Sequence, residues 1–276
     1  MDEARNKPIG VFDSGTGGLT VLRALRSRLP YEDIVYLGDT ARLPFGTKSG
    51  KTVTSYAMQA ARYLAGQGIK MLVVACNTAS AVALEALEEA FPDLPVQGVV
   101  EPGAEAACRA TKAGHVLVLG TESTVRGGAY QRAIARRRPD IRVQSRACQL
   151  FVSLAEEGWI DGPVVEGAAA RYLDEFFVGP EIQAPDCVLF GCTHFPVLRL
   201  AVESVVGRFG VAIVDSAETT AEAVGQVLAG QGLEREHDHP GTTRFCVTDS
   251  PDRFTRVGRI FLGRKVDPDH VSLVDL

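Results

Sequence analysis

Short apolar runs rich in Val, Ile and Leu recur along the chain, and each is followed by a stretch with helical periodicity. The runs predict strands at residues 9–13, 34–38, 71–76, 96–100, 116–120, 141–145, 188–191 and 212–215. Between them, apolar positions three and four apart predict helices that include residues 53–64, 79–91, 168–177, 220–228 and 252–262. Alternating strands and helices of this kind are typical of an α/β fold with mainly parallel sheets.

Two strand-and-loop units recur in similar form in the two halves of the chain. The segment GVFDSGTGG corresponds to VLVLGTEST, and MLVVACNTAS corresponds to CVLFGCTHFP, so Cys76 and Cys192 hold equivalent positions. Similar offsets for both pairs suggest two similar domains, and the alternative is the chance regularity of α/β sequences. We expect an N-terminal half at residues 1–100, a second half at 101–212, and a C-terminal segment at 213–276 that packs on the first half.

The overall composition excludes several classes of protein. The chain has 276 residues, 46% of them hydrophobic and 23% charged, so it can bury a sizeable core. Its 29 Lys and Arg against 34 Asp and Glu give a net charge of −5, the wrong sign for neutralising nucleic-acid phosphates. No apolar run is long enough to cross a bilayer, and the start, MDEARNKPIG, lacks the apolar stretch of a signal peptide. We therefore expect a cytoplasmic protein with neither a nucleic-acid nor a membrane partner.

Six cysteines are scattered along the chain without the paired spacing of disulfide or zinc motifs. In a cytoplasmic protein they should be reduced, so each either fills the core or reacts. Because the close ligand pairs of zinc sites are missing, we expect no metal. Cys108, Cys148, Cys187 and Cys246 are interpreted as packing residues.

The residues placed to react are those that follow the predicted strands, because ligands bind beyond the carboxyl ends of parallel strands. Cys76 and Cys192 both occupy such positions, and the dipole of a following helix favours a thiolate there. His194 lies two residues after Cys192, where an extended backbone points both side chains the same way. Either cysteine alone is more simply a small core residue, but the matched placement of both favours a pair that reacts across one cleft.

The glycine-rich segment DSGTGG follows the first predicted strand. Its backbone N–H groups can cradle a phosphate or a carboxylate at the start of a helix. It matches neither the P-loop nor the dinucleotide-binding signature. Asp13 is either a helix cap or a group that orients or deprotonates a nearby thiol, and the spacing leaves both interpretations open.

The ordered set of motifs resembles the bacterial glutamate racemases within the wider aspartate/glutamate racemase family. GVFDSGTGGLTV, YLGDTARLPFG, ACNTAS, EPG, GTEST, GCTHFP and VDSAETTA fall in the family's order and spacing, between about residues 9 and 262. The resemblance implies two α/β domains with the active site in the cleft between them. It also implies a cofactor-independent enzyme that inverts Cα of glutamate with two cysteines.

In that reaction one thiolate removes the α proton while the opposite thiol delivers a proton to the other face. The resemblance implies that Cys76 acts on D-glutamate and Cys192 on L-glutamate, with Asp13 assisting Cys76 and His194 assisting Cys192. A mostly protonated thiol needs such a partner at neutral pH.

The family also has an acidic residue in the segment that matches CQLFVSLAEEGW. It corresponds to Glu156, although the neighbouring Glu157 is an alternative.

Substrate binding is assigned by the same resemblance to short polar side chains and backbone amides. The matching positions are Ser14, Phe45, Gly46, Asn77, Thr78, Thr121, Thr124 and Thr193. Each Ser or Thr can also be an ordinary helix cap. The family usually has tyrosine at Phe45, and a missing hydroxyl hydrogen bond would lower affinity by about 1 kcal/mol.

We therefore expect a glutamate racemase that supplies D-glutamate for peptidoglycan, without a cofactor, and, by resemblance, as a homodimer. One alternative is an aspartate racemase using the same thiols. Another is a non-catalytic protein that binds an anionic metabolite at the DSGTGG and GTEST loops. A cysteine hydrolase built on Cys192 and His194 is a third, but it leaves Cys76 without a task.

Overall fold

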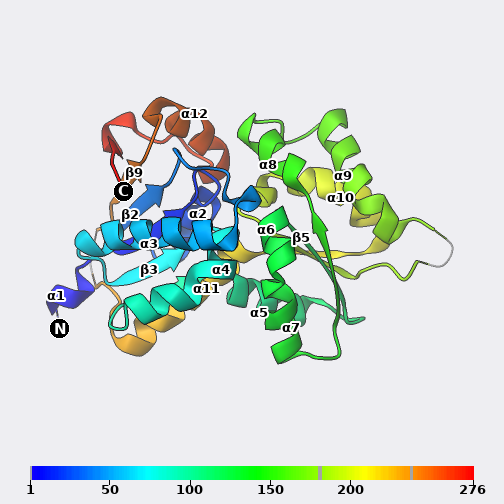
Figure 1. The fold of residues 1–276 in the computed structure, drawn as a ribbon, viewed down its shortest axis with the longest axis horizontal. Helices are drawn as coiled ribbons and strands as arrows, with labels where there is room; N and C mark the ends of the chain where they lie inside the picture. Colours follow the sequence, from blue (N-terminus) through cyan, green and yellow to red (C-terminus); the bar gives the residue numbers. More distant parts are fainter. Residues whose placement is uncertain (1, 180–181, 237–238) are drawn as a thin grey trace.

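The computed structural model, which describes residues 2–179, 182–236 and 239–276, has two parallel sheets flanked by helices (Figure 1). The first has strand order β10-β9-β2-β1-β3-β4, with β1 (Ile9–Asp13), β2 (Ile34–Gly38), β3 (Met71–Val74), β4 (Val96–Gly98), β9 (Thr243–Val247) and β10 (Val271–Leu273). The second has order β6-β5-β7-β8, with β5 (His115–Gly120), β6 (Arg142–Ala147), β7 (Cys187–Gly191) and β8 (Ala212–Asp215). Every strand pair is parallel, so the predicted α/β class is confirmed.

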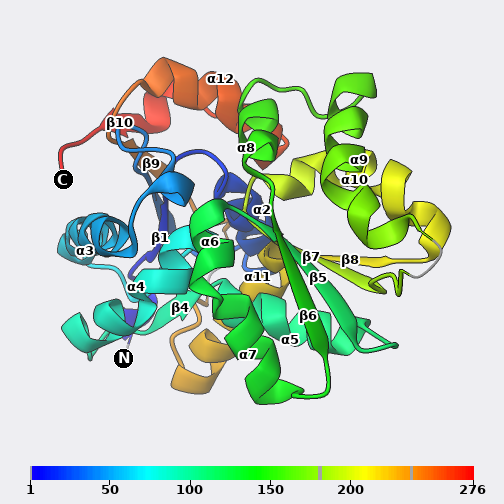
Figure 2. The ribbon, with the colours of Figure 1, turned by 45° about the vertical axis from the view of Figure 1, so that its right-hand side comes forward.

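Helices connect the strands and cover the sheets (Figure 2). They are α1 (Asp2–Arg5), α2 (Leu19–Arg28), α3 (Gly50–Gly66), α4 (Asn77–Ala90), α5 (Val100–Ala110), α6 (Glu122–Gly127), α7 (Ala129–Arg137), α8 (Gln149–Glu156), α9 (Pro163–Phe177), α10 (Arg199–Val206), α11 (Ser216–Gln231) and α12 (Pro251–Leu262). Short 3-10 turns lie at Phe45–Thr47, Phe195–Leu198, Gly207–Phe209 and Pro268–His270. Helix α11, which follows a strand of the second sheet, packs against both α2 and α5. It therefore ties the two sheets together.

Helix α3 shows how the sequence pattern sets the packing. Its buried positions include Val53, Ala57, Ala60 and Leu64, which recur every three or four residues along one face. The helix starts after Ser49, whose hydroxyl accepts a hydrogen bond from the backbone N–H of Thr52. The predicted stripe is thus the face that α3 turns toward the first sheet and α4.

Most strand predictions agree closely with the structure. Strands β1, β2 and β8 have the predicted bounds, and β5 and β7 each begin one residue earlier than predicted. The predictions at 71–76 and 96–100 were too long, because α4 begins at Asn77 and α5 at Val100. Strands β9 and β10 were missed. The first residues of β9 are exposed or half-buried and β10 has only three residues, so neither stands out as an apolar run.

The chain crosses between the sheets twice. It enters the second sheet through α5 and leaves it through α11, after which β9 adds to the first sheet beside β2. The predicted boundary at residue 212 falls inside β8, which belongs to the second sheet. The predicted boundary near residue 100 falls at the first turn of α5.

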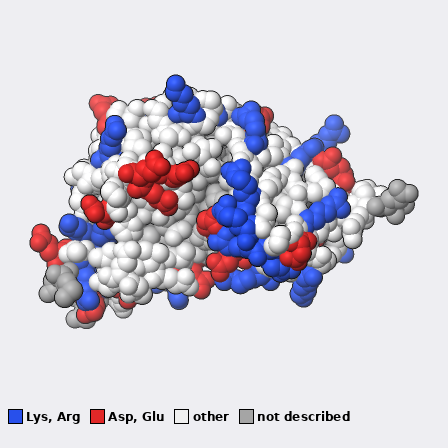
Figure 3. All heavy atoms as spheres, turned by 60° about the horizontal axis from the view of Figure 1, so that its bottom comes forward, with Lys and Arg blue, Asp and Glu red and all other residues white. Residues whose placement is uncertain are grey.

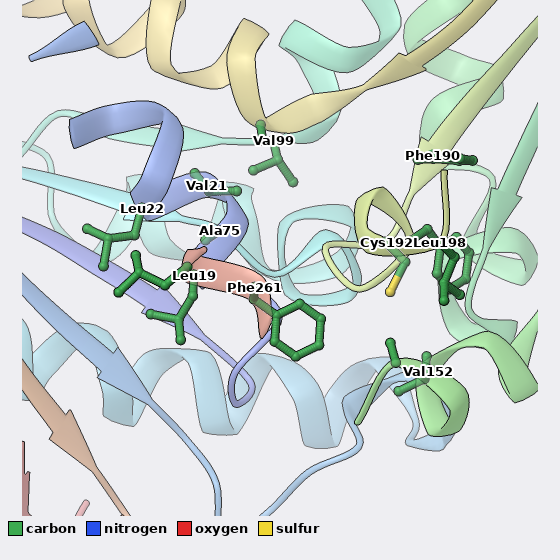
Figure 4. Close-up of a cluster of buried hydrophobic side chains, with 14 of the residues drawn as sticks. Leu19, Val21, Leu22, Ala75, Val99, Val152, Phe190, Cys192, Leu198 and Phe261 are labelled. Atoms are coloured by element: carbon green, nitrogen blue, oxygen red, sulfur yellow. The ribbon is translucent and has the colours of Figure 1, made fainter. Parts of the chain in front are cut away.

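One buried apolar cluster runs from the first sheet to the second (Figure 4). It includes Leu19 and Leu22 of α2, Phe190 of β7 and Phe261 of α12. Since these side chains are at most 1% exposed, the two halves share a continuous core. Among the described residues, no helix has the length and apolar character needed to cross a membrane.

Charged side chains of both signs are spread over the surface drawn in Figure 3. The arginine-rich end of α7 is one of the more basic places, but its charges are largely paired. Arg136 and Arg137 both bind Glu101 of α5, and Arg138 binds Asp140 at 2.7 Å. Such pairing is typical of a solvated helix end.

The packing of α12 on the first sheet predicts the effect of truncating Phe254. The ring is 1% exposed and lies 5.9 Å from the ring of Tyr36 and 5.8 Å from that of Phe245, centroid to centroid. Phe254→Ala should lower the free energy of unfolding by about 3 to 5 kcal/mol, because it removes buried surface and leaves a cavity. Urea denaturation followed by circular dichroism measures the change. Leu200→Ala, at a side chain 71% exposed, serves as the control and should change it by less than about 0.5 kcal/mol.

Candidate active site

The segments after β1, β2, β3, β5 and β7, together with helix α8, meet at the junction of the two sheets and line one pocket. Its empty volume, including the opening to solvent, is about 440 Å³. Eleven of the predicted site residues line it: Ser14, Phe45, Gly46, Cys76, Asn77, Thr78, Thr121, Glu156, Cys192, Thr193 and His194. Asp13 and Thr124 do not line the pocket but lie behind its wall.

Cys76 occupies the N-cap position of α4 and contributes a buried thiol to the wall. Its Sγ lies 3.5 Å from Oγ of Ser14. Burial and the negative charge of Asp13 raise the pKa of the Cys76 thiol to about 12, against the opposing effect of the Ala79 N–H and the Ser14 hydroxyl. At neutral pH Cys76 is therefore a thiol that can donate a proton.

Asp13, at the end of β1, is fully buried behind Cys76. Its Oδ2 accepts a hydrogen bond from the N–H of Gly15 at 2.9 Å, whereas Oδ1 has no hydrogen-bond partner within the described ranges. Burial raises the pKa of this carboxyl, although the charge of His194 and nearby backbone N–H groups lower it. Asp13 does not line the pocket, and its negative charge is one of the causes that raise the pKa of the Cys76 thiol.

On the opposite side, three groups form a line of polar contacts that ends at Cys192. Sγ of Cys192 lies 3.8 Å from Nδ1 of His194, and Nε2 of His194 lies 2.8 Å from Oε1 of Glu156. Burial alone would lower the pKa of His194, but its contacts with Cys192 and Glu156 outweigh burial and raise the pKa to about 10. His194 is therefore a cation at neutral pH and places a positive charge beside the Cys192 sulfur.

Glu156, and not Glu157, is the carboxylate that the structure brings into the pocket. Its Oε1 also accepts a hydrogen bond from Oγ1 of Thr16 at 2.6 Å, and its Oε2 pairs with Arg253 at 3.1 Å. Burial would raise the pKa of Glu156, yet His194, Thr16 and Arg253 together lower it. Glu157 is exposed at the end of α8.

Three threonine hydroxyls form a second polar cluster. Oγ1 of Thr78 lies 3.0 Å from Oγ1 of Thr121 and 3.3 Å from Oγ1 of Thr124. Thr121 also caps α6 by accepting from the N–H of Thr124, so it is both a helix cap and a pocket residue. Thr124 supports the other two from behind the wall.

Gly46 shows how closely the two halves approach. A Cβ atom at this position would lie 2.6 Å from Cβ of Thr121, a separation that real Cβ atoms essentially never show. Phe45 beside it is buried and packs its ring 6.1 Å from Phe12 and 5.6 Å from Tyr56. It gives the pocket an apolar wall where a tyrosine would bring a hydroxyl.

Several lining residues were not predicted: Gly15, Leu43, Pro44, Gln149 and Val152. Leu43 and Pro44 lie in the same LPFG motif as Phe45. Gln149 and Val152 lie seven and four residues before Glu156 in α8, so helical periodicity from Glu156 would have found both. Oε1 of Gln149 and Oδ1 of Asn77 are buried with no hydrogen-bond partner in the part of the chain that is described.

Across residues 2–179, 182–236 and 239–276, no cluster of three or more His, Cys, Asp or Glu side chains is arranged to hold a metal ion. The cysteines outside the pocket are free thiols. Cys148, Cys187 and Cys246 are buried and Cys108 is half-buried.

Known proteins resemble this chain over nearly its whole length. The family model for Asp/Glu/Hydantoin racemase matches residues 20–224. The glutamate racemase of Geobacter metallireducens is 49% identical over 97% of each chain. The crystal structure of glutamate racemase from Francisella tularensis in complex with D-glutamate is 36% identical, has a TM-score of 0.90 and covers 98% of each chain. Glutamate racemase from Thermus thermophilus, in complex with Beta-chloro-D-alanine, is 43% identical with a TM-score of 0.86, and the match covers 99% of this chain and 98% of that one.

These similarities agree with each other and with the fold: the family model spans α2 to α11, and the relatives and solved structures match 97% to 99% of the chain. Identities of 36% to 49% extend over almost complete chains. The chain belongs to the Asp/Glu/Hydantoin racemase family, and within it to the glutamate racemases.

Proposed function

We propose that the protein is an amino-acid racemase that interconverts L- and D-glutamate by proton transfers between Cα of the substrate and two thiols, Cys76 and Cys192. One observation carries this proposal: the two thiols, from loops of different sheets, line the same narrow pocket. A hydrolase that used a single nucleophile would have no task for the second thiol. Inversion at carbon needs a base on one face and an acid on the other, which is what two thiols supply.

In the direction from L- to D-glutamate, the thiolate of Cys192 removes the proton from Cα. The thiol of Cys76 then delivers its proton to the opposite face, so the negative charge passes from one sulfur to the other. The reverse direction exchanges the two roles. The His194 cation stabilises negative charge on Cys192, and Glu156 keeps His194 oriented and protonated.

The surroundings of Cys76 favour the protonated thiol, which is the form that can act as an acid. Its pKa of about 12 and the adjacent carboxyl of Asp13 keep the proton on sulfur until a carbanion forms at Cα. When D-glutamate is the substrate, Asp13 accepts that proton and so generates the thiolate. The raised pKa of Asp13 suits this task, since it makes the carboxylate a stronger base.

Glutamate brings two carboxylates and one ammonium group, and the pocket has groups for both kinds of charge. The N-terminus of α4, at Cys76, Asn77 and Thr78, favours a carboxylate through its free N–H groups and dipole. The ammonium is the ligand's hydrogen-bond donor, and the unpartnered oxygens of Asn77 and Gln149 are acceptors in the pocket wall.

The same proposal includes the biological setting. D-Glutamate made by the enzyme supplies peptidoglycan synthesis in the cytoplasm, no cofactor takes part, and the protein acts as a homodimer. Within each chain, residues 1–100 with the C-terminal segment form one domain, and the residues from 101 to the end of β8 form the other. Closure of these domains over the substrate excludes water from the carbanion.

Replacing either thiol tests the proposal directly. With L-glutamate in D₂O, the wild-type protein should lose its circular dichroism signal while deuterium enters Cα. Cys76→Ser and Cys192→Ser should each slow racemisation by about 10³-fold, because each removes the acid or the base on one face. Cys108→Ser, outside the pocket, should leave the rate unchanged. Full activity in either pocket variant would contradict the two-thiol scheme, and faster turnover of aspartate would contradict the substrate.

The raised pKa of Cys76 predicts its reactivity toward iodoacetamide. Only the thiolate reacts, so with a pKa of about 12 the alkylation rate should rise about tenfold per pH unit from pH 7 to 10 without levelling off. Peptide mass spectrometry measures the rate at this residue. In urea-unfolded protein the rate should level off above about pH 9, as for an ordinary thiol. A plateau near neutral pH in the folded protein would show that Cys76 is already a thiolate.

The close approach of Gly17 to His194 predicts the effect of adding a side chain at position 17. A Cβ atom at Gly17 would lie 2.4 Å from Nδ1 of His194 and 2.6 Å from Oγ1 of Thr193. Gly17→Ala should therefore displace the imidazole from Cys192 and lower kcat/KM at least about tenfold, since small misplacements of catalytic groups are costly. Gly66→Ala is the matched control, because no atom lies within 4 Å of a Cβ added there. Equal activity of the two variants would mean that His194 does not need this position.

A further inference from the structure

We propose that Arg253, in the first turn of α12, is a positioning residue for racemisation: it fixes the Glu156 carboxylate that orients His194 beside Cys192. The inference rests on the proposed function, because it assigns a role within the same reaction. Arg253 does not line the substrate pocket, so it acts only through Glu156.

The contacts form an unbroken line from the surface to the reacting sulfur. Nη2 of Arg253 binds Oε2 of Glu156 at 3.1 Å. The other carboxylate oxygen, Oε1, accepts hydrogen bonds from His194 and Thr16 at 2.8 and 2.6 Å. Because Arg253 holds one oxygen, the carboxylate cannot rotate away from His194 without breaking an ion pair.

Helix α12 holds the His194 imidazole in a second way. Phe261, two turns after Arg253, packs its ring edge-on against the imidazole, with centroids 5.0 Å apart. The buried face of α12 includes Phe254, Val257 and Phe261, so packing on the first sheet fixes the helix that carries Arg253. Figures 1 and 2 both show α12 beside α8, the helix that ends at Glu156. Arg253 therefore links α12, which packs on the first sheet, to the Glu156 carboxylate that holds His194 in the second half.

Several charged and titratable groups face Glu156 from the elements packed around it. They are Arg253 of α12, Asp249 in the loop before α12, and His194, Cys192 and Cys76 around the pocket, with Asp13 and Tyr36 behind the wall. Arg253 is one of the groups that hold the pKa of Glu156 below its ordinary value, so removing its positive charge makes the Glu156 carboxylate easier to protonate. A protonated Glu156 no longer holds His194 as a cation, so the acidic limb of the pH profile should move to higher pH.

Kinetics of Arg253→Gln test the proposal. The acidic limb of kcat/KM should move up by about half a pH unit, the size expected for a half-exposed ion pair. At neutral pH kcat should fall about threefold to tenfold, while KM changes less than twofold, because Arg253 does not touch the pocket. The shift should shrink at about 0.5 M salt, where exposed charges are screened.

Two further variants separate positioning from simple loss of stability. Arg253→Lys keeps the positive charge, so it should return the acidic limb of kcat/KM to its wild-type position and restore most of kcat. Arg256→Gln removes an exposed arginine one turn further along α12 and should leave the profile unchanged. A fall in rate that leaves the limb in place and is not rescued by lysine would show a merely structural role and overturn the proposal.

NMR titration of His194 gives a readout that does not depend on turnover. With ¹⁵N-labelled histidine, and the His194→Gln variant to assign the signal, the imidazolium should be lost at lower pH in Arg253→Gln than in the wild type, because a carboxylate that is no longer fixed holds the His194 proton less well. If the wild type does not racemise glutamate but this shift is present, the proposed function fails while the coupling stands. An unchanged His194 titration in an active enzyme would overturn the role of Arg253.

Discussion

The hydrogen bond between Glu156 and His194 is the interaction on which the rest of the site depends. Both side chains are at most 10% exposed, and each would be costly to bury as a charge without the other. Thr16 from the first half and Arg253 from α12 complete the coordination of the carboxylate. Groups from both halves therefore hold the carboxylate that keeps a cation beside Cys192.

The two thiols occupy equivalent positions in the sequence but have opposite surroundings. Cys76 has a buried carboxyl behind it, and Cys192 has a cation beside it. This asymmetry does not favour one enantiomer overall, because L- and D-glutamate have equal free energies in water and kcat/KM must be the same in both directions. The asymmetry can change kcat and KM separately for each enantiomer. It can also decide which of the two sulfurs carries the negative charge between turnovers.

The sequence predicted the fold, and the place of the two pocket thiols within it, where local pattern and position coincide. Cys76 and Cys192 could be found because strand ends are recognisable and the carboxyl edge of a parallel sheet is where ligands bind. Arg253 could not, since it lies 97 residues from Glu156 and only the packing of α12 brings the two together. Strands β9 and β10 were not predicted for a related reason. They are recognisable by their pairing with β2 and with each other, and not by their own apolar pattern.

The glycines of DSGTGG illustrate how the same residues can serve a different physical purpose from the one their pattern suggests. The pattern favoured a cradle of backbone N–H groups for an anion. In the structure a Cβ at Gly17 would collide with His194, and one at Gly18 would lie 2.5 Å from Cβ of Asp13. Both glycines therefore leave room for ionisable side chains, one on each side of the pair of thiols. Asp13 and His194 can approach the loop this closely only because glycine has no side chain. The glycines are therefore needed for space in the crowded site as well as for the conformation of the backbone.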